Sequence, residues 1–316
     1  MTYSTISFPS LGISVNPGYG LDIGSFSIRY YGIIIAVGLL LACIYGLRRG
    51  KQFGLTQDDI IDGALMIIPF AIICARAYYC IFAWDEFAAN PISVLYIWNG
   101  GIAIYGGVIG AAIGIVAYCL WKKIPIGTAL DITSLGFLIG QSIGRWGNFF
   151  NREAFGSETA SFLRMGLEKI ATGAVTYHHP TFLYESLWNA AGFVLLHFLS
   201  KRRKYDGQIA LGYAAWYGLG RTFIEGLRTD SLYWGPFRVS QMLAAISCLV
   251  ATSILIWNAF RDRDPEKLYV NRVAARNAAA EAEAAALEAE VAEEISKTAE
   301  ETTEEISETA EETTEA

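Results

Sequence analysis

The first long apolar stretch of the chain, IRYYGIIIAVGLLLACIYGLRRGK, occupies residues 28–51 and decides the fold class. A run of about 20 mainly apolar residues is long enough to cross the hydrocarbon core of a bilayer. The composition agrees, since 53% of the 316 residues are hydrophobic and only 17% are charged. That balance is too apolar for an ordinary soluble protein of this size, so the sequence predicts a membrane protein.

Six further apolar runs follow, which gives seven predicted crossings. The seven runs lie at about 28–47, 60–82, 101–121, 126–144, 181–199, 208–227 and 238–260. Basic residues cluster after the first, third, fifth and seventh runs, at 48–51, 122–123, 201–204 and 261–267. Short basic loops favour the cytoplasmic side. We therefore expect an all-α polytopic fold with seven transmembrane helices, the N-terminus outside and the C-terminus in the cytoplasm.

The chain divides at about residue 270 into a membrane domain, 1–270, and a low-complexity tail, 271–316. Residues 281–316 contain fourteen Glu and one Lys and therefore have a net charge of −13. Since the whole chain has a net charge of −7, the first 280 residues have a net charge of +6. An 11-residue near-repeat at 293–303 and 304–314 can support a supercoil. Its only large apolar residues are Ile295 and Ile306, so a solvated, fraying or disordered tail is expected. A small folded head is expected at about 145–180.

Several ionisable residues lie inside the apolar runs, where each charge costs about 2.5 kcal/mol or more. They are Arg76, Asp131, Arg145, Glu185, Arg221 and Glu225. A rise of about 1.5 Å per residue places the three arginines and Glu225 in the outer third of the bilayer. Several guanidiniums at that depth suit a phosphate, which Arg binds through paired N–H donors. A phospholipid headgroup is the phosphate available there.

Two ion-pair partners of Glu225 are predicted by spacing alone. Arg221 precedes Glu225 by four residues and Arg228 follows it by three, so the three side chains share one helix face. The alternative interpretation of this ladder is a structural ion pair that fixes helix packing. For Gly110 and Gly114, close helix packing is the favoured interpretation.

Five motifs then become specific. They are RYYG (29–32), NGGIAIYGG (99–107), GRWGNFFNREAFG (144–156), HPTFLYES (179–186) and YGLGRTFIEGLR (217–228). In order and spacing they resemble the motifs of the bacterial prolipoprotein diacylglyceryltransferase family, over about residues 8 to 260. The resemblance implies transfer of a diacylglyceryl group from phosphatidylglycerol to the lipobox cysteine of prolipoprotein signal peptides, with release of glycerol phosphate. It also implies a multi-pass protein of the bacterial cell membrane.

Carried over by position, the resemblance implies the functional residues Tyr31, Arg145, Asn148, Glu153, Gly156, Tyr217, Arg221 and Glu225. We expect Arg145 and Arg221 to hold the phosphate that becomes the leaving group. Glu225 would then fix Arg221, while Glu153 positions the headgroup or helps to deprotonate the thiol. Membrane lipids are the expected surroundings. No metal, organic cofactor or nucleic acid partner is expected.

One position departs from the family pattern. Many members have His before the glycine pair of the second motif, whereas this chain has Tyr105. A phenol with a pKa of about 10 is a poor base at neutral pH. The alternatives for Tyr105 are that it orients a substrate, relays a proton or has little catalytic role. His178 and His179 are alternative bases, although structural roles are favoured for both. His197 is expected to pack, and Glu185 to pair with a neighbouring helix.

Two other classes of protein compete with the enzyme. A transporter also lines its path with membrane charges, but repeated halves and a midplane site are typical of transporters and neither is seen here. A non-catalytic lipid-binding protein would use the same arginines. Only the 144–156 signature separates that alternative from an enzyme.

Overall fold

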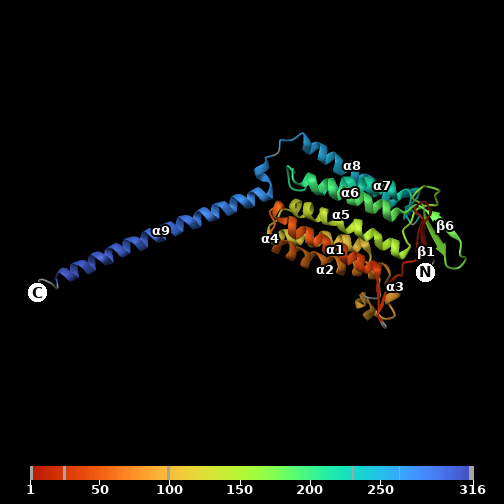
Figure 1. Ribbon diagram of the computed structural model, residues 1–316, viewed down its shortest axis with the longest axis horizontal. Coiled ribbons are helices and arrows are strands. Elements are labelled where there is room, and N and C mark those ends of the chain that lie inside the picture. The colour runs from red at the N-terminus through yellow and green to blue at the C-terminus, as the bar shows by residue number, and fades with distance from the viewer. Residues whose placement is uncertain (1–2, 24–25, 98–99, 230, 263, 313–316) are drawn as a thin grey trace.

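The computed structural model describes residues 3–23, 26–97, 100–229, 231–262 and 264–312 (Figure 1). Long helices lie side by side in a bundle, a small sheet covers one end, and a single long helix projects from the other. We call these the sheet end and the tail end. Asn99, the first residue of the 99–107 motif, lies outside the described residues.

The bundle contains a helix at each of the seven predicted positions. They are α1 (Tyr30–Arg49), α2 (Gln57–Phe82), α4 (Ile104–Lys122), α5 (Ile126–Asn151), α6 (Thr181–Ser200), α7 (Gln208–Glu225) and α8 (Val239–Ala259). In the described part of the chain, all of these except α7 are long and apolar enough to cross a membrane. Because α7 includes Gln208, Arg221 and Glu225, it is more polar, and its crossing stays a prediction.

Glycine brings α2 and α4 into close contact. A Cβ at Gly106 would lie 2.4 Å from the Cys74 carbonyl oxygen, and one at Gly110 would lie 2.5 Å from the Phe70 carbonyl oxygen. Gly114 continues the same face, with Ile67 Cα at 3.1 Å. These distances confirm the packing role predicted for Gly110 and Gly114.

The principal hydrophobic core lies toward the tail end of the bundle. It joins α4, α5, α6 and α7 to the short helix η2 (Gly50–Phe53), through residues that include Phe53, Tyr118, Leu135, Leu196 and Ile209. These helices are therefore held firmly together at the end opposite the sheet.

The sheet corrects the all-α expectation. It has the antiparallel order β2-β1-β5-β6, built from β1 (Tyr3–Phe8), β2 (Ile13–Val15), β5 (Met165–Lys169) and β6 (Val175–His178). The pairing of Ile6 with Leu167 joins the N-terminus to the predicted head. Ile6, Leu167 and Phe182 form a second, smaller core. The β1–β5 pairing joins segments far apart in the sequence, which is why no local pattern revealed it.

The remaining elements are short. Two hairpins are formed by β3 (Gly20–Ile23) with β4 (Phe26–Arg29) and by β7 (Tyr233–Trp234) with β8 (Phe237–Arg238). The helical turns are η1 (Pro9–Leu11), α3 (Trp84–Phe87), η3 (Pro91–Leu95) and η5 (Pro265–Lys267).

The acidic tail forms one helix, α9 (Tyr269–Glu312), which projects away from the bundle (Figure 1). Its root is docked, since the Tyr269 N–H donates to Asp206 Oδ2 at 2.9 Å. Beyond the root, the side chains described along 274–295 are almost all exposed. The structure has an exposed helix along this stretch, whereas the sequence led us to expect a solvated, fraying or disordered tail. Its many Ala and Glu residues have high helix propensity.

Candidate active site

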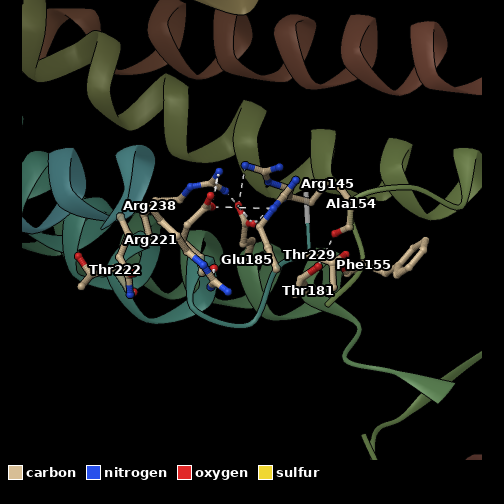
Figure 2. Close-up of polar contacts among 12 residues, drawn as sticks. Arg145, Ala154, Phe155, Thr181, Glu185, Arg221, Thr222, Thr229 and Arg238 are labelled. Carbon is tan, nitrogen blue, oxygen red and sulfur yellow. Dashed lines mark hydrogen bonds and ion pairs between the residues drawn. The ribbon is translucent and has the colours of Figure 1, made fainter. Parts of the chain in front are cut away.

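Glu185 is the centre of an ion-pair cluster at the sheet end of the bundle. It lies in the second turn of α6 and is only 3% exposed. Its Oε2 is 2.5 Å from Arg145 Nη2 of α5, and its Oε1 is 3.1 Å from Arg221 Nη1 of α7. Figure 2 shows the arginines from these two helices converging on this carboxylate. Arg228 Nη1 approaches the same Oε1 at 3.4 Å.

Glu225 is the second carboxylate of the cluster and is 2% exposed. Its Oε2 lies 2.7 Å from Arg221 Nη2 and 3.8 Å from Arg228 Nε, so the ladder predicted from spacing is confirmed. Arg238 donates to the Glu225 backbone carbonyl. We call Arg145, Glu185, Arg221, Glu225 and Arg228 the arginine cluster.

The arginine cluster carries more positive than negative charge. Three guanidiniums face two carboxylates, which leaves one positive charge in excess. Side-chain exposure is 22% for Arg145, 17% for Arg221 and 10% for Arg228. Arg145 and Arg221 are therefore the members that an anion from outside reaches most easily. The glutamates hold both guanidiniums in place before any ligand arrives.

The end of α5 places a second group of polar residues near Arg145. Asn148 Nδ2 and Asn151 Nδ2 each donate to Glu153 Oε1 at 3.2 Å. Tyr31, near the start of α1, packs its ring against Gly147 at this end of α5. Tyr31 can pack this closely because a Cβ at Gly147 would lie 2.6 Å from its ring. Four residues of the predicted site are thereby brought together.

Gly156 lies where three chain segments cross. Its N–H donates to the His179 carbonyl at 2.9 Å, and it forms an isolated β-bridge with Arg228. A Cβ here would lie 2.7 Å from His179 Cβ and 2.9 Å from the Leu227 carbonyl oxygen. These contacts require a glycine and join the signature motif to the segments that begin α6 and follow α7.

Arg152 anchors the signature motif and was missed by the sequence reasoning. It is 4% exposed, and its guanidinium donates to the Ser4 and Phe150 carbonyls at 2.8 Å each. It also stacks 4.3 Å from the Tyr19 ring centroid. Its place inside the charged run NREAF was the available signal. From the sequence we expected Glu185 to form a supporting ion pair with a neighbouring helix. In the structure it lies at the centre of the arginine cluster.

Arg76 lies outside the arginine cluster, contrary to the grouping by depth. Its guanidinium donates to the carbonyls of Ser93, Val94, Gly100 and Gly101 at 2.7–2.8 Å. It is 7% exposed. Arg76 therefore fastens the segment after α2 to the helix, because four backbone acceptors satisfy its buried charge.

Tyr105 lies apart from the arginine cluster, whereas Tyr217 lies beside it on α7. Tyr105 is 51% exposed in the first turn of α4, and its ring lies 6.5 Å from that of Tyr78 on α2. Among the described residues, no hydrogen bond, ion pair or ring contact joins it to the arginine cluster. Tyr217 lies on α7 one turn before Arg221 and stacks on Tyr213 at 5.6 Å.

The histidines have structural partners. His178 is buried, with its ring nitrogens 3.0 Å from the Gly156 carbonyl and 3.0 Å from Thr176 Oγ1. His179 Nδ1 lies 3.3 Å from the Tyr184 hydroxyl, and His197 Nδ1 lies 2.9 Å from that of Tyr45. In the described residues, His, Cys, Asp and Glu side chains form no group of three that could hold a metal ion.

The fold and the site define a class: a multi-pass membrane protein with a buried, net cationic arginine cluster at one end of its helices. Comparison with known proteins goes further. Residues 19–257 match the sequence profile of the prolipoprotein diacylglyceryl transferase family. The chain belongs to this family.

Three relatives illustrate the similarity, each named a phosphatidylglycerol–prolipoprotein diacylglyceryl transferase. The protein of Ligilactobacillus salivarius is 44% identical over 260 residues, covering 80% of this chain and 96% of the relative. That of Listeria monocytogenes (strain HCC23) is 41% identical over 253 residues, covering 78% and 91%. That of Limosilactobacillus reuteri (strain DSM 20016) is 43% identical over 242 residues, covering 74% and 88%.

Proposed function

We propose that this protein transfers the diacylglyceryl group of phosphatidylglycerol to the lipobox cysteine of prolipoproteins, the first step of bacterial lipoprotein maturation. The cysteine sulfur forms a thioether bond with the terminal glycerol carbon. The bond from that carbon to the phosphate oxygen breaks, its electron pair leaves with glycerol phosphate, and the thiol proton is released. The observation that carries the proposal is the arginine cluster within the family's matched region.

The arginine cluster supplies the leaving-group chemistry. Arg145 and Arg221 bind the phosphate oxygens, and they stabilise the negative charge that grows as the carbon–oxygen bond breaks. Glu185 and Glu225 hold the two guanidiniums in position, so little reorganisation is needed at the moment of reaction. Arg228 contributes the remaining positive charge of the site.

The residues around the end of α5 receive the rest of the substrate. Tyr31 and Asn148 bind the headgroup, while Glu153, which is exposed, positions it or accepts the thiol proton. The cationic surroundings favour the thiolate form of the incoming cysteine, so a strong dedicated base is not required. Gly156 allows the close approach of backbone segments, and Tyr217 borders the phosphate from one turn below Arg221.

We place the protein in the bacterial cytoplasmic membrane with seven crossings, including α7, and with the sheet end outside. The four basic loops at the tail end support this orientation. The arginine cluster then lies at the level of the outer-leaflet headgroups, where phosphatidylglycerol and a signal peptide both reach it. Membrane lipids surround the helices, and the acidic tail stays in the cytoplasm.

The test follows glycerol phosphate release from phosphatidylglycerol in liposomes with a lipobox peptide. Arg145→Ala and Arg221→Ala are expected to abolish release, and a peptide with Ser in place of Cys to give none. Arg164→Ala removes a half-buried arginine of the head that lies outside the arginine cluster, and it is the matched control. The Tyr105→Phe rate reports whether the phenol takes part. Lipid binding without release by folded wild type would instead support the non-catalytic alternative.

A further inference from the structure

Asp131 is a fully buried carboxylate at the tail end of α5 for which the proposed chemistry has no use. It is 0% exposed. Its Oδ2 accepts the Gly207 N–H at 2.9 Å, and its Oδ1 accepts the Ala210 N–H at 2.9 Å. Both donors belong to the beginning of α7, so one side chain of α5 fastens the start of another helix.

The start of α7 has no cap of its own. Its N-cap residue, Gly207, adopts φ +95° and offers no side chain to the free N–H groups of the first turn. These groups need acceptors, and a negative charge is favourable at a helix N-terminus. Close approach is possible because Gly127 faces the loop, where a Cβ would lie 2.8 Å from the Asp206 carbonyl carbon.

The same two helices carry Arg145 and Arg221, the two most accessible arginines of the arginine cluster. Helices α5 and α7 run in the same direction, with α6 returning between them (Figure 1). Arg145 follows Asp131 by fourteen residues, and Arg221 follows Gly207 by fourteen. At 1.5 Å per residue both intervals are about 21 Å. Matching the helices at the tail end therefore brings both arginines to the same height at the sheet end.

We propose that Asp131 is a positioning residue for the reaction: by capping α7 from α5 it sets the axial register that brings Arg145 and Arg221 together on Glu185. This rests on the proposed role of those arginines in holding the phosphate. Other contacts constrain α7 less completely. Trp188 and Trp216 exchange indole N–H bonds with each other's carbonyls, but these join α7 to α6. Between α5 and α7, the Gln141 amide donates to the Tyr213 hydroxyl at 2.9 Å.

The test measures register and catalysis separately in full-length protein. Asp131→Ala removes both acceptors, and Asp131→Asn keeps one acceptor oxygen without the charge. Thr128→Val is the matched control, since Thr128 is also 0% exposed on α5 and its hydroxyl has no hydrogen-bond partner among the described residues. Spin labels at Leu40 of α1, which packs on α5, and at Phe223 of α7 report the register in a background without native cysteines. Both sites are exposed.

We expect Asp131→Ala to broaden the label distance and to lower kcat/KM for phosphatidylglycerol about tenfold or more, equivalent to about 1.4 kcal/mol. KM for the lipobox peptide should stay unchanged, Asp131→Asn should lie between, and Thr128→Val should match wild type. An unchanged distance in Asp131→Ala would overturn the register role. A broadened distance with wild-type kcat/KM would overturn the link to catalysis. Activity retained by Arg221→Ala would instead refute the proposed phosphate site. The label distance tests the register role whether or not that site is correct.

Discussion

Glu185 forms ion pairs with all three arginines of the arginine cluster. Replacing it with Gln leaves Arg145 without its carboxylate partner and leaves Glu225 to pair with Arg221 and Arg228. Breaking a buried ion pair by removing one partner costs about 3–5 kcal/mol. We therefore expect Glu185→Gln to lower both the unfolding free energy, measured by detergent-denaturant titration, and transferase turnover. Glu158→Gln, an exposed carboxylate of the head, is the control. Wild-type stability in Glu185→Gln would contradict the central role given to this carboxylate.

Gly156 is the glycine of the signature motif whose Cβ would meet the backbone of another segment. A methyl group there would overlap His179 Cβ and the Leu227 carbonyl, and overpacking costs about 1–3 kcal/mol. Gly156→Ala should lower the melting temperature and displace Arg228, reducing transferase activity. Gly140→Ala is the control, because its Cβ would meet nothing within 4 Å. If Gly156→Ala melts as wild type but loses lipid affinity, a direct substrate contact is the better explanation.

At the scale of elements, the contact between α2 and α4 depends on which glycine faces the neighbour. Gly110→Ala should force the helices apart, since its Cβ would lie 2.5 Å from the Phe70 carbonyl oxygen. Gly107→Ala should be tolerated, because its closest neighbour would be 3.7 Å away. The melting temperatures of the two variants in detergent give the comparison. Equal melting temperatures would show that this pair does not limit stability.

The helices were predictable because each is written in a continuous run of sequence, from the apolar stretch at 28–47 to the one at 238–260. The Arg221–Glu225 ladder was predictable for the same reason, since i to i+4 spacing fixes its geometry. What depends on contacts between distant segments was not predictable. Depth alone grouped Arg76 with the site, and only the fold reveals that its guanidinium is satisfied by loop carbonyls. The sheet pairing of Ile6 with Leu167 had no local signal either.

For the whole molecule, the proposed orientation places the sheet end outside and α9 in the cytoplasm. Single cysteines at Ser10, in η1, and at Ala279, in α9, test it in a background without native cysteines. Both positions are exposed. A membrane-impermeant maleimide added to intact cells should label Ser10→Cys at once, and Ala279→Cys only after permeabilisation. The reverse pattern would invert the proposed topology and place the arginine cluster at the cytoplasmic face.

The arginine cluster and the acidic helix α9 lie at opposite ends of the molecule. The arginine cluster and the signature motif lie at the sheet end, while α9 leaves from the tail end and carries thirteen of the 31 acidic residues. Among the described residues, the contacts between α9 and the body lie at its root: Tyr269 bonds to Asp206, and Val270 packs against Gly54.

Truncation after Ala280 should therefore leave transferase kcat/KM and the melting temperature unchanged, because the root is kept and the deleted segment lies beyond it. Truncation after Leu268 removes the root as well. It should lower the melting temperature, since Leu268 is 9% exposed and the contacts around Asp206 and Gly54 would be lost. Assays of both variants in liposomes separate the two parts of α9. If truncation after Ala280 already lowered the activity, the acidic part of α9 would have a direct part in the reaction. Its distance from the arginine cluster argues against that outcome.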